Sequence, residues 1–322
     1  MRRLIVGVLA VLVMSACSST AVITTTTPRT IATTTTTTTT AAQPSPFPTT
    51  VVAANGAVEI QETPQAIVSL SPTATEMLFA IGAGGQVIAV DDQSNYPESA
   101  PVTDLTGFSP NVEAIVAYDP DLVLITFDPG DLIASLGALG IPVLLEPGAA
   151  SLTDVYEQIE QLGIATGHQQ EALDLVELMR ARIGVIRFAA TAPPSSDEKL
   201  TYYFELDPTY YSVTSTTFIG QLVGLLGLEN IADPADADGY GYPQLSAEYI
   251  IDADPDLIFL ADTKCCSQNI GAVAERPGWK TLTAVTEGHV FALDDDLASR
   301  WGPRVVDLLD TIATAVSQVK HP

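Results

Sequence analysis

Short apolar runs rich in β-branched residues alternate with amphipathic stretches between residues 66 and 145. Ser71-Pro72 and Ser109-Pro110 each place a capping serine before a proline, which suits the first position of a helix. Strand followed by helix, repeated several times, predicts a mostly parallel α/β sheet. The pattern predicts strands at residues 66–70, 87–90, 122–126 and 143–145, and helices at residues 73–81, 111–118 and 132–139.

A longer helical period follows this series. Apolar residues recur near a 3.6-residue period from Gly167 to Ala190, and Thr166 with Gln169 predicts a capping box at the start. Beyond Pro193-Pro194 a second series predicts strands at residues 200–206, 257–261 and 290–293, and helices at residues 218–226, 247–253 and 297–319.

The fold class is therefore α/β, with two Rossmann-like α/β lobes joined by one long α-helix and a ligand cleft between the lobes. We predict the N-terminal lobe at residues 57–166, the connecting helix at residues 167–191 and the C-terminal lobe at residues 192–322. An internal match supports two equivalent lobes, because residues 113–125 (EAIVAYDPDLVLI) align without gaps on residues 248–260 (EYIIDADPDLIFL). Each copy predicts a helix, a turn at a proline that cannot continue it, and a buried strand.

The N-terminus carries a secretory signal, predicted at residues 1–17. Arg2 and Arg3 precede an apolar run of residues 4–14, which is too short to span a bilayer. Met14-Ser15-Ala16-Cys17 resembles a bacterial lipobox, so Cys17 is the expected lipidation site, although an ordinary signal peptide with an incidental cysteine is the alternative. The protein is thus expected outside the cytoplasm, anchored to the cell membrane.

Residues 18–56 are rich in threonine and proline and almost free of charge. Such a segment buries too little apolar area to offset the entropy of ordering, so we predict a disordered tether.

The charge balance and the residue motifs argue against several classes of function. With 39 acidic against 13 basic residues, the chain has a formal net charge of −26, which argues against a nucleic-acid partner. The three histidines, His168, His289 and His321, do not form a metal-ligand pattern. No nucleophile elbow, phosphate-binding glycine loop or zincin helix is present, so we predict no catalytic residue, no metal site, no cofactor of its own and no enzymatic activity.

If Cys17 carries a lipid, two adjacent cysteines remain, Cys265 and Cys266. Their Cα atoms lie about 3.8 Å apart across a trans peptide, whereas ordinary disulfides span about 4.4 to 6.8 Å. The sequence leaves a strained disulfide and two free thiols open, with a slight preference for the disulfide outside the cell.

Motifs along nearly all of the chain after residue 60 resemble one known family. They are residues 66–82 (AIVSLSPTATEMLFAIG), 90–97 with Tyr96-Pro97, 107–113, 242–248, 276–279 (RPGW) and 300–304 (RWGPR). They resemble the binding proteins that serve ABC importers for vitamin B12, ferric siderophores and haem. The resemblance implies capture of a metal chelate, a ferric siderophore or vitamin B12-type ligand, and its delivery to a permease dimer with ATPase subunits. It also implies a monomer with the ligand between its lobes.

The resemblance further implies residue roles. Glu113 and Glu248 match the family's two acidic positions that meet arginines of the permease, although a glutamate in the first turn also simply favours the helix dipole. Ligands bind beyond the carboxyl ends of strands in open α/β sheets. The candidate ligand-binding residues there are Gln93, Phe108, Tyr211, Cys265, Cys266, Asp296, Arg300 and Trp301.

Two alternatives to this function stay open. One is a haem-binding importer component, and the other is a surface receptor or sensor of the same fold without transport. The receptor would share the cleft but would not need both Glu113 and Glu248.

Overall fold

The structure, a computed structural model, describes residues 46–190 and 199–320. The predicted signal peptide, Cys17 and most of the predicted tether lie outside the described residues. The predicted tether, residues 18–56, extends too far toward the C-terminus. β1 (Thr49–Ala53) lies inside its last part and pairs with β2 (Gly56–Ile60) in an antiparallel hairpin. Val51, Ala53 and Ile60 bury their side chains in the main core, which stabilises the hairpin.

Four parallel strands form the N-terminal sheet in the spatial order β4-β3-β5-β6. Successive side chains of a strand point to opposite faces. Ile67 accordingly joins the main core, whereas Val68 joins a second cluster under the other face. The strands are β3 (Ile67–Leu70), β4 (Val87–Val90), β5 (Leu122–Ile125) and β6 (Val143–Leu145). The helices are α1 (Pro72–Ala80), α2 (Val112–Val116), α3 (Leu132–Gly137) and α4 (Leu152–Thr166), with a 3-10 turn η1 (Ala83–Gln86).

A second four-stranded parallel sheet lies C-terminal to these elements, in the order β10-β9-β7-β8. Numbered along the chain within each sheet, both sheets have the same order: second, first, third, fourth strand. The strands are β7 (Thr201–Glu205), β8 (Glu229–Asn230), β9 (Leu257–Leu260) and β10 (Val290–Ala292). The helices before α10 are α6 (Phe218–Gly224), α7 (Ala247–Ala253), α8 (Ile270–Ala274) and α9 (Thr283–Thr286), with 3-10 turns η2 (Asp233–Ala235) and η3 (Trp279–Thr281). Two parallel sheets flanked by helices confirm the predicted fold class.

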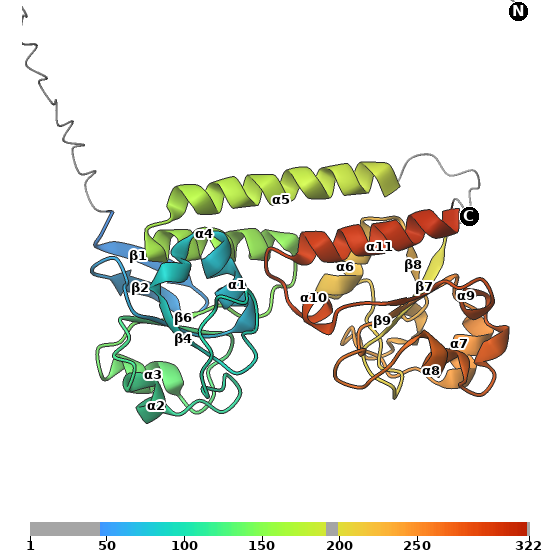
Figure 1. Cartoon of the computed structure of the whole chain (residues 1–322), viewed down its shortest axis with the longest axis horizontal. Coiled ribbons are helices and arrows are strands. Elements are labelled where there is room, and N and C mark those ends of the chain that lie inside the picture. The colour runs from blue at the N-terminus through green and yellow to red at the C-terminus, as the bar shows by residue number, and fades with distance from the viewer. Residues whose placement is uncertain (1–45, 191–198, 321–322) are drawn as a thin grey trace, which may run out of the picture. The chain divides into compact units, whose positions relative to one another are not determined.

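The long helix predicted between the two series is present as α5 (Gln169–Ala190), and it packs against α4 and α11 (Figure 1). The predicted capping box at its start is wrong. Thr166 is the last residue of α4, and its hydroxyl donates to the carbonyl of Leu162. Gly167 then ends α4 in the left-handed conformation.

The helix predicted over residues 297–319 is in fact two helices, α10 (Asp295–Ser299) and α11 (Val305–Lys320). Pro303 lies between them and lacks the N–H that a continuous helix needs. The break allows residues 300–304 to cross toward α1, where Arg300 and Arg304 meet Glu76.

The internal sequence match is a structural equivalence. Asp119 and Asp254, the first aspartate of each Asp-Pro-Asp, both adopt positive φ, at 51° and 41°. The second aspartate of each copy secures the strand next to it. Asp121 accepts hydrogen bonds from the N–H groups of Gln65 and Ala66, and Asp256 accepts from the N–H and hydroxyl of Thr201. The same turn thus fixes the central strand pair of each sheet.

Candidate ligand-binding site and docking surfaces

A cavity of about 430 Å³ lies at the carboxyl ends of β3, β4 and β5, closed on one side by α10 and the residues after it. Parallel strands present their following loops at this edge, which is where open α/β sheets bind ligands. Five predicted ligand-binding residues share the cavity: Gln93, Phe108, Asp296, Arg300 and Trp301.

Aromatic rings form part of the cavity wall. The ring centroids of Phe108 and Phe127 are 5.8 Å apart, and both side chains are exposed. Trp301 also lines the cavity, and its indole Nε1 donates to Gln158 at 2.9 Å, which fixes the ring. Such rings offer flat apolar area to a large ligand.

Asp91 is a buried carboxylate in the cavity wall. Ser94 donates its hydroxyl to Asp91 Oδ1 at 2.6 Å, and burial raises the pKa of Asp91 above its usual value. A Cβ at position 107 would lie 2.8 Å from Asp91 Oδ2 and 2.8 Å from the carbonyl oxygen of Leu70. Gly107 therefore allows the loop that carries Phe108 to pass this close to the wall.

Arg300 reaches the cavity wall with three of its five N–H donors already used. Its guanidinium donates to Glu76 at 2.8 Å, to the carbonyl of Gln93 at 2.9 Å and to Asp296 at 3.0 Å. Asp296 also accepts from Lys264 Nζ at 2.7 Å and from the Asn95 amide at 3.1 Å. Arg300 thereby joins the α10 segment to α1 and to the loop after β4.

The other predicted ligand-binding residues do not line this cavity. Tyr211 is exposed and lies in an antiparallel bridge with Gln244. Cys265 and Cys266 form a disulfide in the loop after β9. The carboxylate of Asp295 holds that loop by accepting hydrogen bonds from the N–H groups of Thr263, Lys264 and Cys265. Lys264 connects the loop to the cavity through Asp296.

The cavity residues that the sequence analysis did not predict as ligand-binding include Asp91, Thr126 and Phe127. Asp91 and Phe127 directly follow predicted strands and Thr126 is the last residue of one, so the rule that ligands bind beyond strand ends could have identified them.

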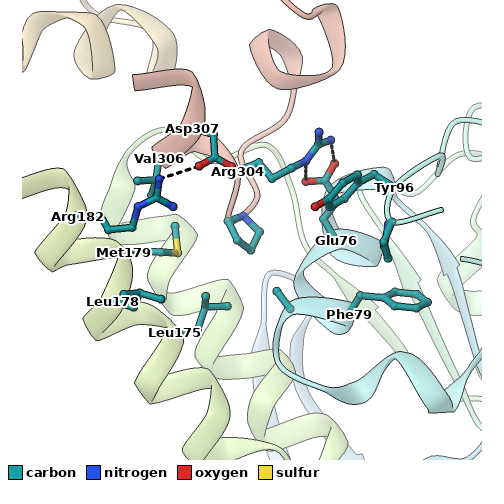
Figure 2. A pocket seen from close by; sticks show the side chains of 13 residues that line it. Glu76, Phe79, Tyr96, Leu175, Leu178, Met179, Arg182, Arg304, Val306 and Asp307 are labelled. Carbon is teal, nitrogen blue, oxygen red and sulfur yellow. Dashed lines mark hydrogen bonds and ion pairs between the residues drawn. The ribbon is translucent and has the colours of Figure 1, made fainter. Parts of the chain in front are cut away.

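Figure 2 shows a second cavity, of about 320 Å³, between α1, α5 and α11. Its walls are mostly apolar, with Leu175 and Met179 contributed by α5 and Phe79 by α1. Two ion pairs border it, Arg182 with Asp307 and Arg304 with Glu76.

Glu113 and Glu248 occupy equivalent places on α2 and α7. Each lies in the first turn of its helix, and each helix begins with a side-chain cap, Asn111 on α2 and Ser246 on α7. Both glutamates are exposed, and in the part of the chain that the structure describes neither has an ion-pair partner. In Figure 1, α2 and α7 lie on the side away from α5.

The sequence model of the periplasmic binding proteins matches residues 67–297, which include both sheets and most of the cavity residues. The chain belongs to the periplasmic binding protein family. Its members bind solutes for import, so membership confirms the predicted class of extracytoplasmic solute-binding protein of an ABC transporter and the prediction that it is not an enzyme.

Relatives of this periplasmic binding protein agree with the assignment. An uncharacterized ABC transporter substrate-binding lipoprotein of Bacillus subtilis is 32% identical over 278 residues, covering 84% of this chain and 86% of the relative. A cobalamin-binding protein of Halobacterium salinarum is 29% identical over 277 residues, covering 84% of this chain and 74% of the relative. The structure of a possible iron-binding, periplasmic solute-binding protein of Staphylococcus epidermidis matches with a TM-score of 0.68 at 25% identity, covering 79% of this chain and 99% of that one.

Two features of the described residues concern metal ligands and membrane spans. No group of three His, Cys, Asp or Glu side chains there is placed to hold a metal ion. Within the same residues, no helix combines the length and apolarity needed to cross a membrane.

Proposed function

We propose that this protein is a lipid-anchored periplasmic binding protein that captures a metal chelate, a corrinoid or a ferric siderophore, and delivers it to an ABC permease dimer. The observation that carries the proposal is the cavity at the strand ends, with Phe108, Phe127 and Trp301 in its wall. A metal already held by its chelator needs shape and stacking area from the protein rather than a set of metal ligands. The cobalamin-binding relative and the possible iron-binding neighbour support this ligand class.

The composition of the cavity favours this class over haem. Haem iron in proteins is held by a histidine, cysteine, methionine or tyrosine. Among the described residues that line the cavity, none is of these four types. A haem bound there would have no axial ligand from this wall.

Docking through Glu113 and Glu248 explains why two equivalent helices each expose an unpaired carboxylate. A permease with two-fold symmetry presents the same basic surface twice, and two equivalent lobes can meet it with the same residue type. Charge pairing of this kind sets orientation and association rate more than affinity. A receptor without transport would not need the pair.

Anchoring follows from the predicted lipid on Cys17, and the Bacillus subtilis relative is named a lipoprotein. Residues 18–45 precede the first described residue, Pro46. We propose these residues as the tether between the lipid on Cys17 and the binding domain.

The ligand can be identified from the protein purified from its native host. A corrin, a haem and a ferric siderophore have different visible absorption bands, so the spectrum and mass of the released chromophore name the class. The proposal expects a corrin or a ferric siderophore, and a titration that binds one equivalent per chain. A haem spectrum would replace it with the haem alternative. Binding of an amino acid or sugar in place of any chelate would contradict it.

A further inference from the structure

Charged side chains are few in the wall of the ligand cavity. Among the described lining residues they are Asp91, Asp296 and Arg300, two carboxylates against one guanidinium. An anionic ligand would therefore depend on Arg300 for compensation, because an ion that leaves water needs a partner of opposite charge.

Arg300 has little left to offer such a ligand. Its side chain is 9% exposed, three of its five N–H donors are used by Glu76, Asp296 and the Gln93 carbonyl, and its charge already faces two carboxylates. A ligand carboxylate that drew the guanidinium of Arg300 away from Glu76 would leave that side chain, which is 2% exposed, as a buried charge with one partner fewer.

Glu76 also forms an ion pair with Arg304. Its Nε donates to Glu76 Oε2 at 2.8 Å, and its guanidinium lies 4.0 Å above the ring of Tyr96 (Figure 2). One buried carboxylate from α1 thus engages both arginines that the segment after α10 brings to this region.

Other donors near the cavity are limited as well. The first turn of α1 borders the cavity, but Pro72 has no N–H, and the N–H of Ala74 donates to the Ser71 hydroxyl. Lys264 pairs with Asp294 and Asp296. The net charge of −26 also repels anions at longer range.

We infer that the cavity selects metal chelates without net negative charge, and that Glu76 is the positioning residue that sets this selectivity by neutralising Arg300 and Arg304. The inference rests on the proposed function, since it names the ligand class of the same cavity. The cavity attracts neutral or cationic chelates through its rings and carboxylates, and it rejects anionic chelates because its carboxylates carry like charge.

Three chelates of different charge test the selectivity in one titration series with the folded protein: cyanocobalamin, which is neutral, ferrioxamine B, which is cationic, and ferric dicitrate, which is anionic. We expect cyanocobalamin or ferrioxamine B to bind, and ferric dicitrate to bind at least about 30-fold more weakly. Equal or tighter binding of ferric dicitrate would overturn the selectivity and leave the metal-chelate function standing. Failure of all three to bind would count against both.

Two isosteric substitutions test the cause. Glu76→Gln removes the charge that holds the arginines, so its affinity for ferric dicitrate should rise about tenfold, whereas Glu76→Asp should keep the wild-type preference. Asp91→Asn removes a wall carboxylate without touching the arginines and should raise the same affinity by a smaller factor. A Glu76→Gln protein that melts normally and shows unchanged selectivity would make Glu76 purely structural. An Asp91→Asn protein with a lower affinity for ferric dicitrate would show that the wall carboxylates do not repel anions.

Discussion

Glu76 and Arg300 form an ion pair of 2.8 Å between side chains that are 2% and 9% exposed. Glu76 belongs to α1, beside the first sheet, and Arg300 follows α10, which comes after the last strand of the second sheet. The pair joins the two halves of the described chain at the edge of the ligand cavity. Stability and ligand selectivity therefore depend on the same carboxylate.

Removing that carboxylate should destabilise the fold strongly. Glu76→Ala leaves Arg300 and Arg304 without their shared partner, and breaking a buried pair costs about 3–5 kcal/mol. Urea unfolding measures the free energy directly. Glu275→Ala is the matched control, because Glu275 pairs with Lys280 while both are well exposed, and its loss should be below about 1 kcal/mol. Similar losses for the two variants would contradict the central place of Glu76.

Stability should fall as the pH rises because of Asp262. Burial and the nearby charge of Glu205 raise the pKa of Asp262 from 3.8 to about 7, and both of its carboxylate oxygens are buried. The folded state thus holds a proton that the unfolded state has released. The stabilisation is fully present below pH 3.8 and is lost as the pH rises through about 7.

Asp262→Asn should accordingly be more stable than the wild type at pH 8, by about 2–4 kcal/mol, and nearly equal to it at pH 4. Urea unfolding at a series of pH values provides the curve. Burial also raises the pKa of Glu146, to about 8, and this acts in the same direction. The stability of the Asp262→Asn variant should therefore still fall with rising pH, but less steeply than that of the wild type. A variant less stable than the wild type at pH 8 would argue against a protonated Asp262.

The disulfide between Cys265 and Cys266 should contribute little to global stability. Asp295 holds the same loop through hydrogen bonds to Thr263, Lys264 and Cys265, and these bonds do not involve sulfur. The Cys265→Ser, Cys266→Ser double variant should unfold within about 1 kcal/mol of the wild type. Asp295→Ala is the comparison and should cost more, about 2 kcal/mol, because three backbone N–H groups lose their acceptor.

The bond itself is tested by thiol titration of the denatured protein. We expect no reactive thiol from this pair before reduction and two after it. Two free thiols in freshly isolated protein would refute the disulfide.

The strands were predictable because each is a short apolar run between turn residues. The expected strands at 87–90 and 143–145 match β4 and β6. The β1–β2 hairpin was not predicted, although Asn55-Gly56 is a hairpin signal. The threonine-rich segment before it led to the prediction of disorder as far as residue 56. The helix α4 was also missed, and with it the true capping box of Ser151 and Asp154.

The cavity was partly predictable for a general reason. Gln93 and Phe108 both come after β4, so the rule that ligands bind beyond strand ends could identify them, whereas Asp296 follows β10 of the second sheet and reaches the cavity only because α10 packs beside the first sheet. Glu76 was not predictable in this way. It lies inside a helix, and its partner Arg300 is 224 residues away, a pairing that no local pattern encodes.

The central claim is that the protein hands its ligand to a permease through Glu113 and Glu248, and uptake of labelled ligand by cells tests it most directly. Glu113→Arg or Glu248→Arg should reduce uptake at least about tenfold, and the double variant should abolish it, while the Kd for the ligand stays within about twofold of the wild type. Glu171→Arg is the control, since Glu171 is also an exposed first-turn glutamate but lies on α5, and it should transport normally. Normal uptake by the Glu113→Arg, Glu248→Arg protein would contradict the account and favour a receptor that binds without transport.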